Sequence, residues 1–309
     1  MRGLLIANPN ATTTDARIRD VLVSATGSVL DLTTITTSHR GHAGELASQA
    51  AVDGTQVVLT LGGDGTVHEV VNGLLGSGAP DLPALGTIPG GSANVFARAC
   101  GLPNEPVIAT GEIIAALRQH RFRRIGLGRA NGLWFTCNAG LGLDAEVIAA
   151  MEHHRSSGRT VTPTRYVTTA LREYFARTDR KHAPLTILPA GAAPVDHGFL
   201  AIVQNCSPWT YLASLPVNAC PDASFETGLD LLAIRDMRVV PSLRVTGRLL
   251  RSSSTQVRSE SMFLGHDLDR FTIVADREVA LQVDGEGLGH TRHITFESVP
   301  DALRIVDCS

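Results

Sequence analysis

The sequence predicts an α/β protein in two parts, a doubly wound parallel-sheet domain followed by a mainly antiparallel, sandwich-like β domain. Three observations support this fold class. Apolar strands alternate with helical segments as far as residue 118, which is typical of a parallel sheet. Two of these strands, residues 57–61 and 84–88, run into glycine-rich turns that open helices. Beyond residue 127, strand-like runs are separated mostly by loops.

The stretch from Val57 to Gly73 is the centre of the first domain. Val57 to Leu61 is an apolar, β-branched run, as expected of a parallel strand covered on both faces. A glycine turn follows, and the apolar residues after it recur at the spacing of one helical face: Val67, Val70, Val71, Leu74 and Leu75. Ligands of open α/β sheets bind at such turns, where bare N–H groups and a helix N-terminus favour phosphate.

The other elements follow the same alternation. In the first domain we expect strands at 3–7, 29–35 and 84–88 and helices at 14–25, 43–52 and 105–118. The loops at 8–12, 37–41, 62–66 and 90–94 should then gather on one edge of the sheet. In the second domain we expect strands at 123–128, 133–138, 185–188, 199–205, 229–234, 271–275 and 279–283, with helices at 144–153 and 165–177. The predicted domains are 1–127 and 128–290, with a C-terminal segment, 291–309, packing back on the first domain.

Composition excludes several classes of protein. The 309 residues carry a net charge of −3, which excludes a generally basic nucleic-acid binder. No apolar run reaches the ~18 residues of a membrane span, and the first apolar stretch is too short for a signal peptide. The five cysteines show no metal-binding spacing and are expected to be reduced. We therefore expect a cytoplasmic protein; its oligomeric state, a homodimer included, is left open.

Lys181 is the single lysine among the 27 basic residues. No lysine accompanies a glycine turn, which excludes mechanisms built on a phosphate-clamping lysine. Any phosphate must therefore be held by backbone N–H groups, metal and arginine.

Asp64 lies inside the first glycine turn and allows two interpretations. It would repel a phosphate unless a cation intervened, which favours Mg²⁺-nucleotide binding with Asp64 acting on the metal or on an acceptor hydroxyl. Alternatively, it caps the helix that begins near Thr66. The turn alone does not decide between these interpretations.

With both glycine turns placed, the chain resembles the diacylglycerol kinase catalytic-domain family, which includes bacterial diacylglycerol kinases and sphingosine kinases. The matching motifs span nearly the whole chain. They are Asn8-Pro9, Thr37 with Gly41-His42-Ala43, Gly62-Gly63-Asp64-Gly65-Thr66, Glu69-x-x-Asn72-Gly73, Pro89-x-Gly91-Ser92-x-Asn94-x-Phe96-Ala97-Arg98, Asn138-Ala-Gly-Leu-Gly-x-Asp144, Gln204-Asn205 and Val283-Asp284-Gly285-Glu286.

The resemblance implies an ATP- and Mg²⁺-dependent lipid kinase with its site in an interdomain cleft and its lipid substrate at a membrane surface. It implies Glu286 as the general base, Asp284 as a residue orienting it or the metal, and Asp144 near the substrate headgroup. Asp64 would act on ATP-bound Mg²⁺. The implied nucleotide-binding positions are Asn8, Thr37, Gly62, Gly63, Gly65, Thr66, Glu69, Asn72, Gly91, Ser92 and Asn94.

Two positions depart from the family pattern. Val95 follows Asn94 where the family often has aspartate. Thr227 stands where bacterial relatives carry an aspartate of a structural Mg²⁺ site, which puts that site in doubt although Glu226 or Asp230 could substitute.

Several motif residues keep a structural alternative. Glu69 and Asn72 could form a solvated helical pair, and Asn94 could cap, bind phosphate or hold its loop. Asp144 could be an N-cap, and Asp284-Gly285 a plain hairpin turn. The arginines at 235, 238, 244, 248, 251 and 258 could attract anionic lipid or form a solvated face.

Two rival functions also remain. NAD kinase shares the Gly-Gly-Asp-Gly turn, although the Asp-Gly-Glu motif and the spacing from Glu69 to Gly73 favour lipid enzymes. A catalytically silent nucleotide- or lipid-binding protein is the second rival, and the presence of Asp64 and Glu286 argues against it.

Overall fold

The computed structural model describes residues 1–11, 16–142, 145–146, 182–212, 214–238 and 261–308. The chain divides into two compact units, residues 1–127 with 300–309 (unit 1) and residues 128–299 (unit 2). The return of residues 300–309 to unit 1 is a pairing within that unit, because Ile305 lies beside Leu85 in parallel register.

Unit 1 is built on a parallel sheet in the order β2-β1-β3-β4. Its strands are β1 (Arg2–Ala7), β2 (Asp31–Thr36), β3 (Val57–Gly62) and β4 (Ala84–Pro89). Every residue of β3 and β4 is buried, as expected of central parallel strands covered on both faces. The predicted parallel α/β architecture is confirmed.

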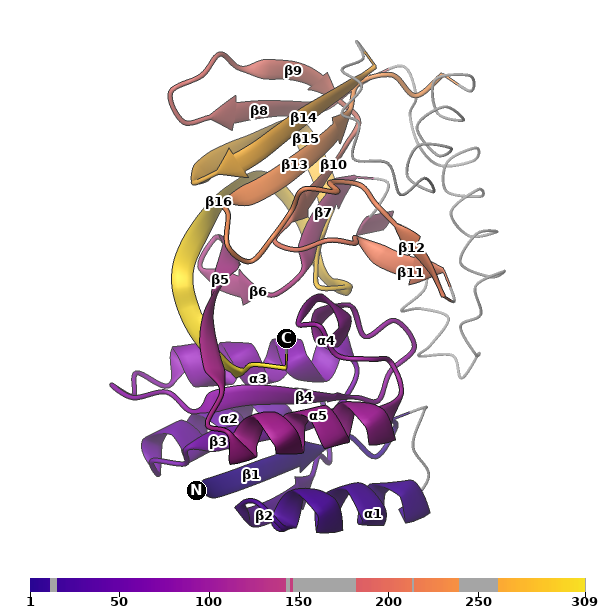
Figure 1. The fold of residues 1–309 in the computed structure, drawn as a ribbon. Helices are drawn as coiled ribbons and strands as arrows, with labels where there is room; N and C mark the ends of the chain where they lie inside the picture. The colour runs from indigo at the N-terminus through magenta and orange to yellow at the C-terminus, as the bar shows by residue number, and fades with distance from the viewer. Residues whose placement is uncertain (12–15, 143–144, 147–181, 213, 239–260, 309) are drawn as a thin grey trace. The chain divides into compact units, whose positions relative to one another are not determined.

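Helices cover both faces of this sheet (Figure 1). They are α1 (Ala16–Gly27), α2 (His42–Val52), α3 (Asp64–Gly76), α4 (Val95–Ala99) and α5 (Pro106–Arg118). Helices α2 and α3 lie backbone to backbone, since a Cβ on Gly73 would lie 2.1 Å from the carbonyl oxygen of Gly44. Gly73 therefore serves helix packing.

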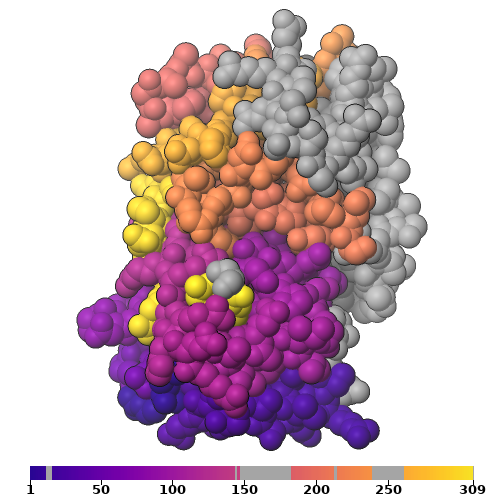
Figure 2. All heavy atoms as spheres, in the orientation of Figure 1, coloured from indigo at the N-terminus to yellow at the C-terminus, as the bar shows by residue number. Residues whose placement is uncertain are grey.

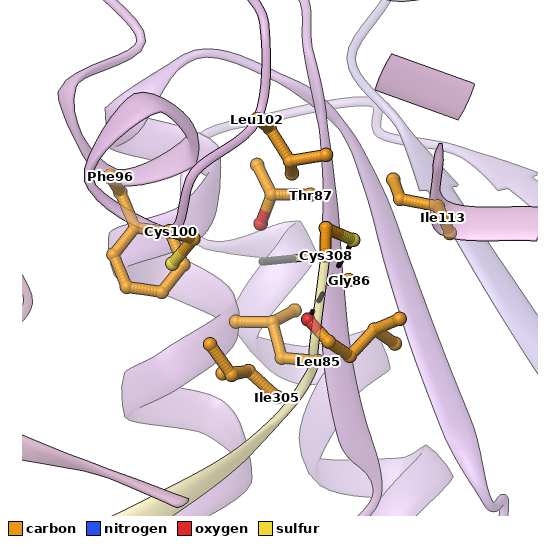
Figure 3. A pocket seen from close by; sticks show the side chains of 10 residues that line it. Leu85, Gly86, Thr87, Phe96, Cys100, Leu102, Ile113, Ile305 and Cys308 are labelled. Carbon is orange, nitrogen blue, oxygen red and sulfur yellow. Dashed lines mark hydrogen bonds between the residues drawn. The ribbon is translucent and has the colours of Figure 1, made fainter. Parts of the chain in front are cut away.

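The C-terminal residues close the core of unit 1. Figure 2 shows them (yellow) among the magenta atoms of the same unit. Beneath them lies a small cavity, of about 10 Å³, whose lining includes Cys100, Ile113 and Cys308 (Figure 3). A space of that size holds at most about one water molecule. It is too small for a nucleotide.

Unit 2 is mainly antiparallel, as predicted. Its sheet runs in the order β14-β13-β10-β7-β15-β16, with β8 beside β15 and β9 beside β8, and with β5 beside β16 and β6 beside β5. Its core includes Phe135, Phe271 and Phe296. The strands are β5 (Phe122–Ala130), β6 (Leu133–Phe135), β7 (Asn138–Gly142), β8 (Leu185–Pro189), β9 (Val195–Gly198), β10 (Leu200–Gln204), β13 (Leu229–Ile234), β14 (Met262–Leu268), β15 (Arg270–Val283) and β16 (Glu286–Val306).

Some predicted elements of unit 2 were wrong. The strands expected at 271–275 and 279–283 are one strand, β15, because an irregularity in its pairing with β16 replaces the expected break. The strand expected at 133–138 is two strands, β6 and β7. A separate hairpin, β11 (Thr210–Leu212) with β12 (Leu215–Val217), was not predicted. Most of the helices expected at 144–153 and 165–177 falls outside the described residues.

Across the part of the chain that the structure describes, no helix is long and apolar enough to cross a membrane.

Candidate functional site

The two glycine turns of unit 1 lie against each other at the carboxyl edge of its sheet. A Cβ on Gly91 would lie 2.7 Å from the Cα of Gly63, and the backbone N–H of Gly90 donates to the carbonyl of Gly62 at 2.8 Å. Real Cβ atoms essentially never approach that closely, so the second turn requires glycine at 91 to fit against the first. The prediction that these loops gather on one edge is confirmed for this pair.

Asp64 caps a helix, but not the one expected. Its carboxylate accepts hydrogen bonds from the backbone N–H groups of Val95, at 3.1 Å, and Phe96, at 3.0 Å. These are the first residues of α4, whereas the sequence alternative made Asp64 the cap of α3. That alternative is wrong, because α3 begins at Asp64 itself with Gly63 as its N-cap.

Glu69 caps a second neighbouring helix. Its carboxylate accepts from the N–H groups of Gly41, at 2.8 Å, and Ala43, at 3.2 Å, at the start of α2. The N-cap of α2 is Gly41, which has no side chain to do this. Asn72 turns back to the carbonyl of His68, at 3.0 Å. The alternative that Glu69 and Asn72 form a solvated pair is therefore wrong. Glu69 instead contacts the loop that leads into α2.

Helix α3 thus caps its neighbours, whereas its own N-cap is Gly63, which has no side chain to bond the first turn. The N-terminal N–H groups of a helix lack partners within the helix and carry partial positive charge. The start of α3 is therefore suited to an anion such as a phosphate.

The end of β1 is tied to the same helix start. The side-chain amide of Asn8 donates to the hydroxyl of Thr66 at 3.1 Å, and Thr66 is buried. Thr37, after β2, donates its N–H to the carbonyl of Ala7 at 2.9 Å. Ser92 is exposed on the second glycine turn. The structure thus brings the predicted nucleotide positions of unit 1 to one edge.

Asn94 holds its own turn. It is buried, with a left-handed backbone (φ 49°), and its side chain exchanges two hydrogen bonds with Gly91, each at 2.8 Å. Its amide also donates to Asn104 at 2.7 Å. Both amide protons are thereby used. Of the three alternatives for Asn94, the geometry favours the loop-holding role over phosphate binding.

In unit 2, Asp284 is turned into the protein. It is buried, and its carboxylate accepts from the N–H groups of Thr136 (2.8 Å), Cys137 (2.8 Å) and Asn138 (3.1 Å) and from the Thr136 hydroxyl (3.1 Å). The carboxylate of Asp284 is therefore bound by the protein's own backbone. It organises the segment between β6 and β7.

Asp284 and Gly285 form the tight turn between β15 and β16. Both have positive φ, 48° and 80°, the pattern of a two-residue type I′ hairpin. Gln282 fixes this turn by accepting from the N–H of Gly285, at 2.8 Å, while its amide donates to Asn138 at 3.0 Å. Glu286 follows as the first residue of β16 and is half-buried.

The residues near Thr227 do not fit a structural Mg²⁺ site. The Thr227 hydroxyl lies 3.2 Å from the carbonyl of Ser224. Asp230 accepts at one oxygen from the His266 imidazole, at 2.8 Å, and from the N–H of Asp267, at 3.1 Å. In the described residues no group of three or more His, Cys, Asp or Glu could hold a metal ion. No local sequence signal indicated this contact of His266 with Asp230.

Burial raises the pKa of Asp230 above its ordinary value of 3.8, although the hydrogen bonds from Asp267 and His266 oppose this. A carboxylate that is so poorly solvated needs a cationic or hydrogen-bonding partner. His266 provides one here.

Other predicted residues lie elsewhere. Asp144 and the arginines at 244, 248, 251 and 258 fall outside the described residues. Arg235 donates to the carbonyl of Asp196 at 3.0 Å, and Arg238 forms an ion pair with Asp236 at 2.6 Å. An open cavity of about 390 Å³ in unit 1 lies at the C-terminal ends of α2 and α3, away from the glycine turns.

Unit 1 therefore falls in the class of parallel α/β domains that present a helix N-terminus at the carboxyl edge of the sheet, a place that suits phosphate. Comparison with known proteins is consistent with this class. Residues 2–130 match the model of the diacylglycerol kinase catalytic domain. These residues, somewhat under half of the chain, are similar to that domain.

Individual relatives agree. The chain is 38% identical over 114 residues to a diacylglycerol kinase of Bacillus subtilis, a match covering 36% of this chain and 35% of that protein. It is 28% identical over 314 residues to a probable lipid kinase YegS-like of Stenotrophomonas maltophilia, covering 98% and 95% of the two chains. The crystal structure of a diacylglycerol kinase from Bacillus anthracis has the same fold, with a TM-score of 0.75 at 20% identity over 99% of this chain and 96% of that one.

Proposed function

We propose that the protein is an ATP- and Mg²⁺-dependent lipid kinase that transfers the γ-phosphoryl group to a hydroxyl of diacylglycerol or a related lipid. The observation that carries the proposal is the N-terminus of α3, whose N-cap is a glycine and which begins where two glycine turns meet, in a region that matches the model of this family. Such an end binds phosphate through backbone N–H groups, which suits a chain with one lysine.

Asp64 has two tasks in this proposal. Its hydrogen bonds to Val95 and Phe96 hold the acid at the start of α3 and partly balance its charge. The same carboxylate would hold the Mg²⁺ of the nucleotide, directly or through water. A single protein carboxylate fits this arrangement, because Mg²⁺ in kinases is held mostly by phosphate oxygens and water. The metal, when bound, neutralises charge on the transferring phosphoryl group.

The acceptor side of the reaction is assigned to the Asp-Gly-Glu turn of unit 2. A lipid hydroxyl is hardly ionised at neutral pH, so a positioned base contributes typically ~10²–10⁴-fold to the rate. Glu286 is the proposed base, and its carboxylate accepts the hydroxyl proton as the oxygen attacks the γ-phosphorus and ADP leaves. Asp284 is a positioning residue, because its buried hydrogen bonds hold the turn that precedes Glu286.

The lipid substrate places the working enzyme at a membrane surface, as a peripheral protein on the cytoplasmic side. Nothing in the composition favours a nucleic-acid partner. A homodimer is compatible with the proposal but is not required by it.

The decisive experiment is incubation of the purified protein with labelled ATP, Mg²⁺ and separate dispersions of diacylglycerol, a sphingoid base, NAD and no acceptor. Labelled phosphatidate from diacylglycerol, abolished by chelation of Mg²⁺, is the expected result. Label on NAD alone would make the protein an NAD kinase. ATP binding without any labelled product would make it a silent nucleotide-binding protein.

A further inference from the structure

The hairpin β11–β12 stands apart from the main sheet of unit 2. It forms a two-stranded sheet of its own, with Tyr211 opposite Pro216 and Leu212 opposite Leu215 (Figure 1). A lone two-stranded ribbon is only marginally stable in water and relies on other contacts. This hairpin therefore needs contacts beyond its own pairing.

The sequence of this region carries no charge. From Trp209 to Val217 the hairpin contains no Asp, Glu, Lys, Arg or His. Charged side chains are one of the devices by which soluble proteins protect exposed strand edges. This hairpin lacks them, which makes it suited to an apolar medium.

Burial changes along the hairpin. Val217, at the base of β12, is 5% exposed, whereas Leu215, two residues closer to the tip on the same face, is 47% exposed. Trp209 and Tyr211 are half-buried at the base and along β11. Aromatic residues with one polar atom prefer the membrane–water interface, and an apolar tip beyond them suits the acyl region.

The hairpin is joined to the acid turn through one residue. Asn138 donates from its side chain to the carbonyl of Trp209, at 3.2 Å, and from its N–H to the carboxylate of Asp284, at 3.1 Å. The carbonyl oxygen of Asn138 in turn accepts from the N–H of Asp284 at 2.7 Å. A single residue, Asn138, thus contacts both the base of the hairpin and the turn that precedes Glu286.

We propose that the β11–β12 hairpin is a membrane-contact element that inserts Leu215 into the surface of a phospholipid bilayer. The proposal rests on the proposed function, because a lipid kinase must meet its acceptor at a bilayer. The bilayer is favoured over a protein partner by the charge-free sequence, the aromatic residues at the base and the link through Asn138 to the acid turn.

The test is sedimentation with phosphatidylcholine vesicles, without ATP and at high salt to suppress attraction by arginine. Leu215→Glu should weaken vesicle binding by about tenfold or more, because burial of a leucine side chain corresponds to that range. Leu188→Glu is the matched control, since Leu188 is a leucine of unit 2 with 37% exposure on β8, outside the hairpin. It should bind vesicles like the wild type.

Fluorescence provides a second reading that does not depend on a charge. The chain has two tryptophans, so Trp134→Phe leaves Trp209 as the single reporter. Its emission should shift to shorter wavelength on vesicle addition and be quenched by lipids brominated on their acyl chains. Leu215→Glu should remove both effects.

Three results would overturn the proposal. The first is that the wild type does not bind vesicles. The second is that Leu215→Glu binds vesicles as well as the wild type. The third is that Leu215→Glu loses a dimer while vesicle binding is unchanged, which would make the hairpin a subunit interface. Because vesicle binding is measured without ATP, these results are distinct from failure of the kinase assay. An inactive protein that still binds vesicles through Leu215 would contradict only the proposed function.

Discussion

The carboxylate of Asp64, on α3, accepts a hydrogen bond of 3.0 Å from the backbone N–H of Phe96, at the start of α4. One acid thereby joins the two glycine turns of unit 1, since α3 follows the first and α4 follows the second. Damage to Asp64 must therefore affect the fold of the edge as well as any chemistry there.

Asp64→Asn keeps the size of the side chain but has one acceptor oxygen for two backbone N–H groups. We expect a loss of about 0.5–2 kcal/mol in unfolding free energy, the usual cost of losing a helix cap. We also expect turnover to be abolished, because the amide carries no charge toward Mg²⁺. Melting curves and the labelled-ATP assay measure the two effects, with the exposed Asp53→Asn as control. Near-full turnover at saturating Mg²⁺ would leave Asp64 a cap alone.

Gly91→Ala tests the contact between the two turns. The new Cβ would lie 2.7 Å from the Cα of Gly63, whereas a Cβ on Gly63 would lie 3.2 Å from the Cα of Gly91. We expect Gly91→Ala to destabilise more than Gly63→Ala, and both to weaken ATP binding by the folded protein. Gly111→Ala, in an open site on α5, should stabilise by about 0.4–1 kcal/mol. Unchanged ATP affinity in both turn variants would limit these glycines to folding.

Glu286→Gln and Asp284→Asn should separate chemistry from positioning. Glu286 is half-buried, so its variant should fold normally and lose at least ~10²-fold in kcat with little change in ATP affinity. Asp284→Asn should lower the melting temperature, because the amide cannot accept all four hydrogen bonds. Steady-state kinetics and calorimetry distinguish them. If Glu286→Gln turns over within a fewfold of the wild type, it is not the base.

Asp230 should make the stability of the protein depend on pH. Its folded pKa is raised by burial above 3.8, so the fold favours the protonated carboxyl. The contribution of Asp230 to the free energy of unfolding is fully present below the pKa of the unfolded state. It is lost as the pH rises through the pKa of the folded state. Urea midpoints measured from about pH 3.5 to 6 should fall less steeply with rising pH in Asp230→Asn than in the wild type. Parallel profiles would contradict the prediction; the exposed Asp196→Asn is the control.

Cys308 should be unreactive in the folded protein. Burial raises the pKa of its thiol to about 11, helped by the charge of Glu112. At pH 8 only about 0.1% of it would be thiolate, the reactive form. Alkylation at that pH should therefore be slow until urea unfolds the chain, and the other four cysteines are buried. Cys308→Ser identifies the site, and labelling of native Cys308 at the rate of free cysteine would contradict the expectation.

Local sequence determined much of unit 1. Apolar runs, glycine turns and helical periodicity placed its strands, most of its helices and the edge where its loops meet, because these signals act over a few neighbouring residues. The strand at 229–234 was placed to the residue for the same reason. By contrast, β16 was not predicted, because its sequence is polar and lacks a regular strand pattern. Its strand conformation comes from pairing with β15 and β4.

The sequence by itself also determined which acids belong to the candidate site, but not which groups they contact. Asp64 and Glu69 accept hydrogen bonds at the N-termini of α4 and α2. These partners lie about thirty residues away in the sequence, so no local pattern predicts them. Asp284 reads as a surface hairpin residue, yet it is buried on backbone N–H groups nearly 150 residues earlier in the chain. Only the tertiary structure decides such partners, because a buried polar group must take its hydrogen bonds from whatever the fold brings within reach.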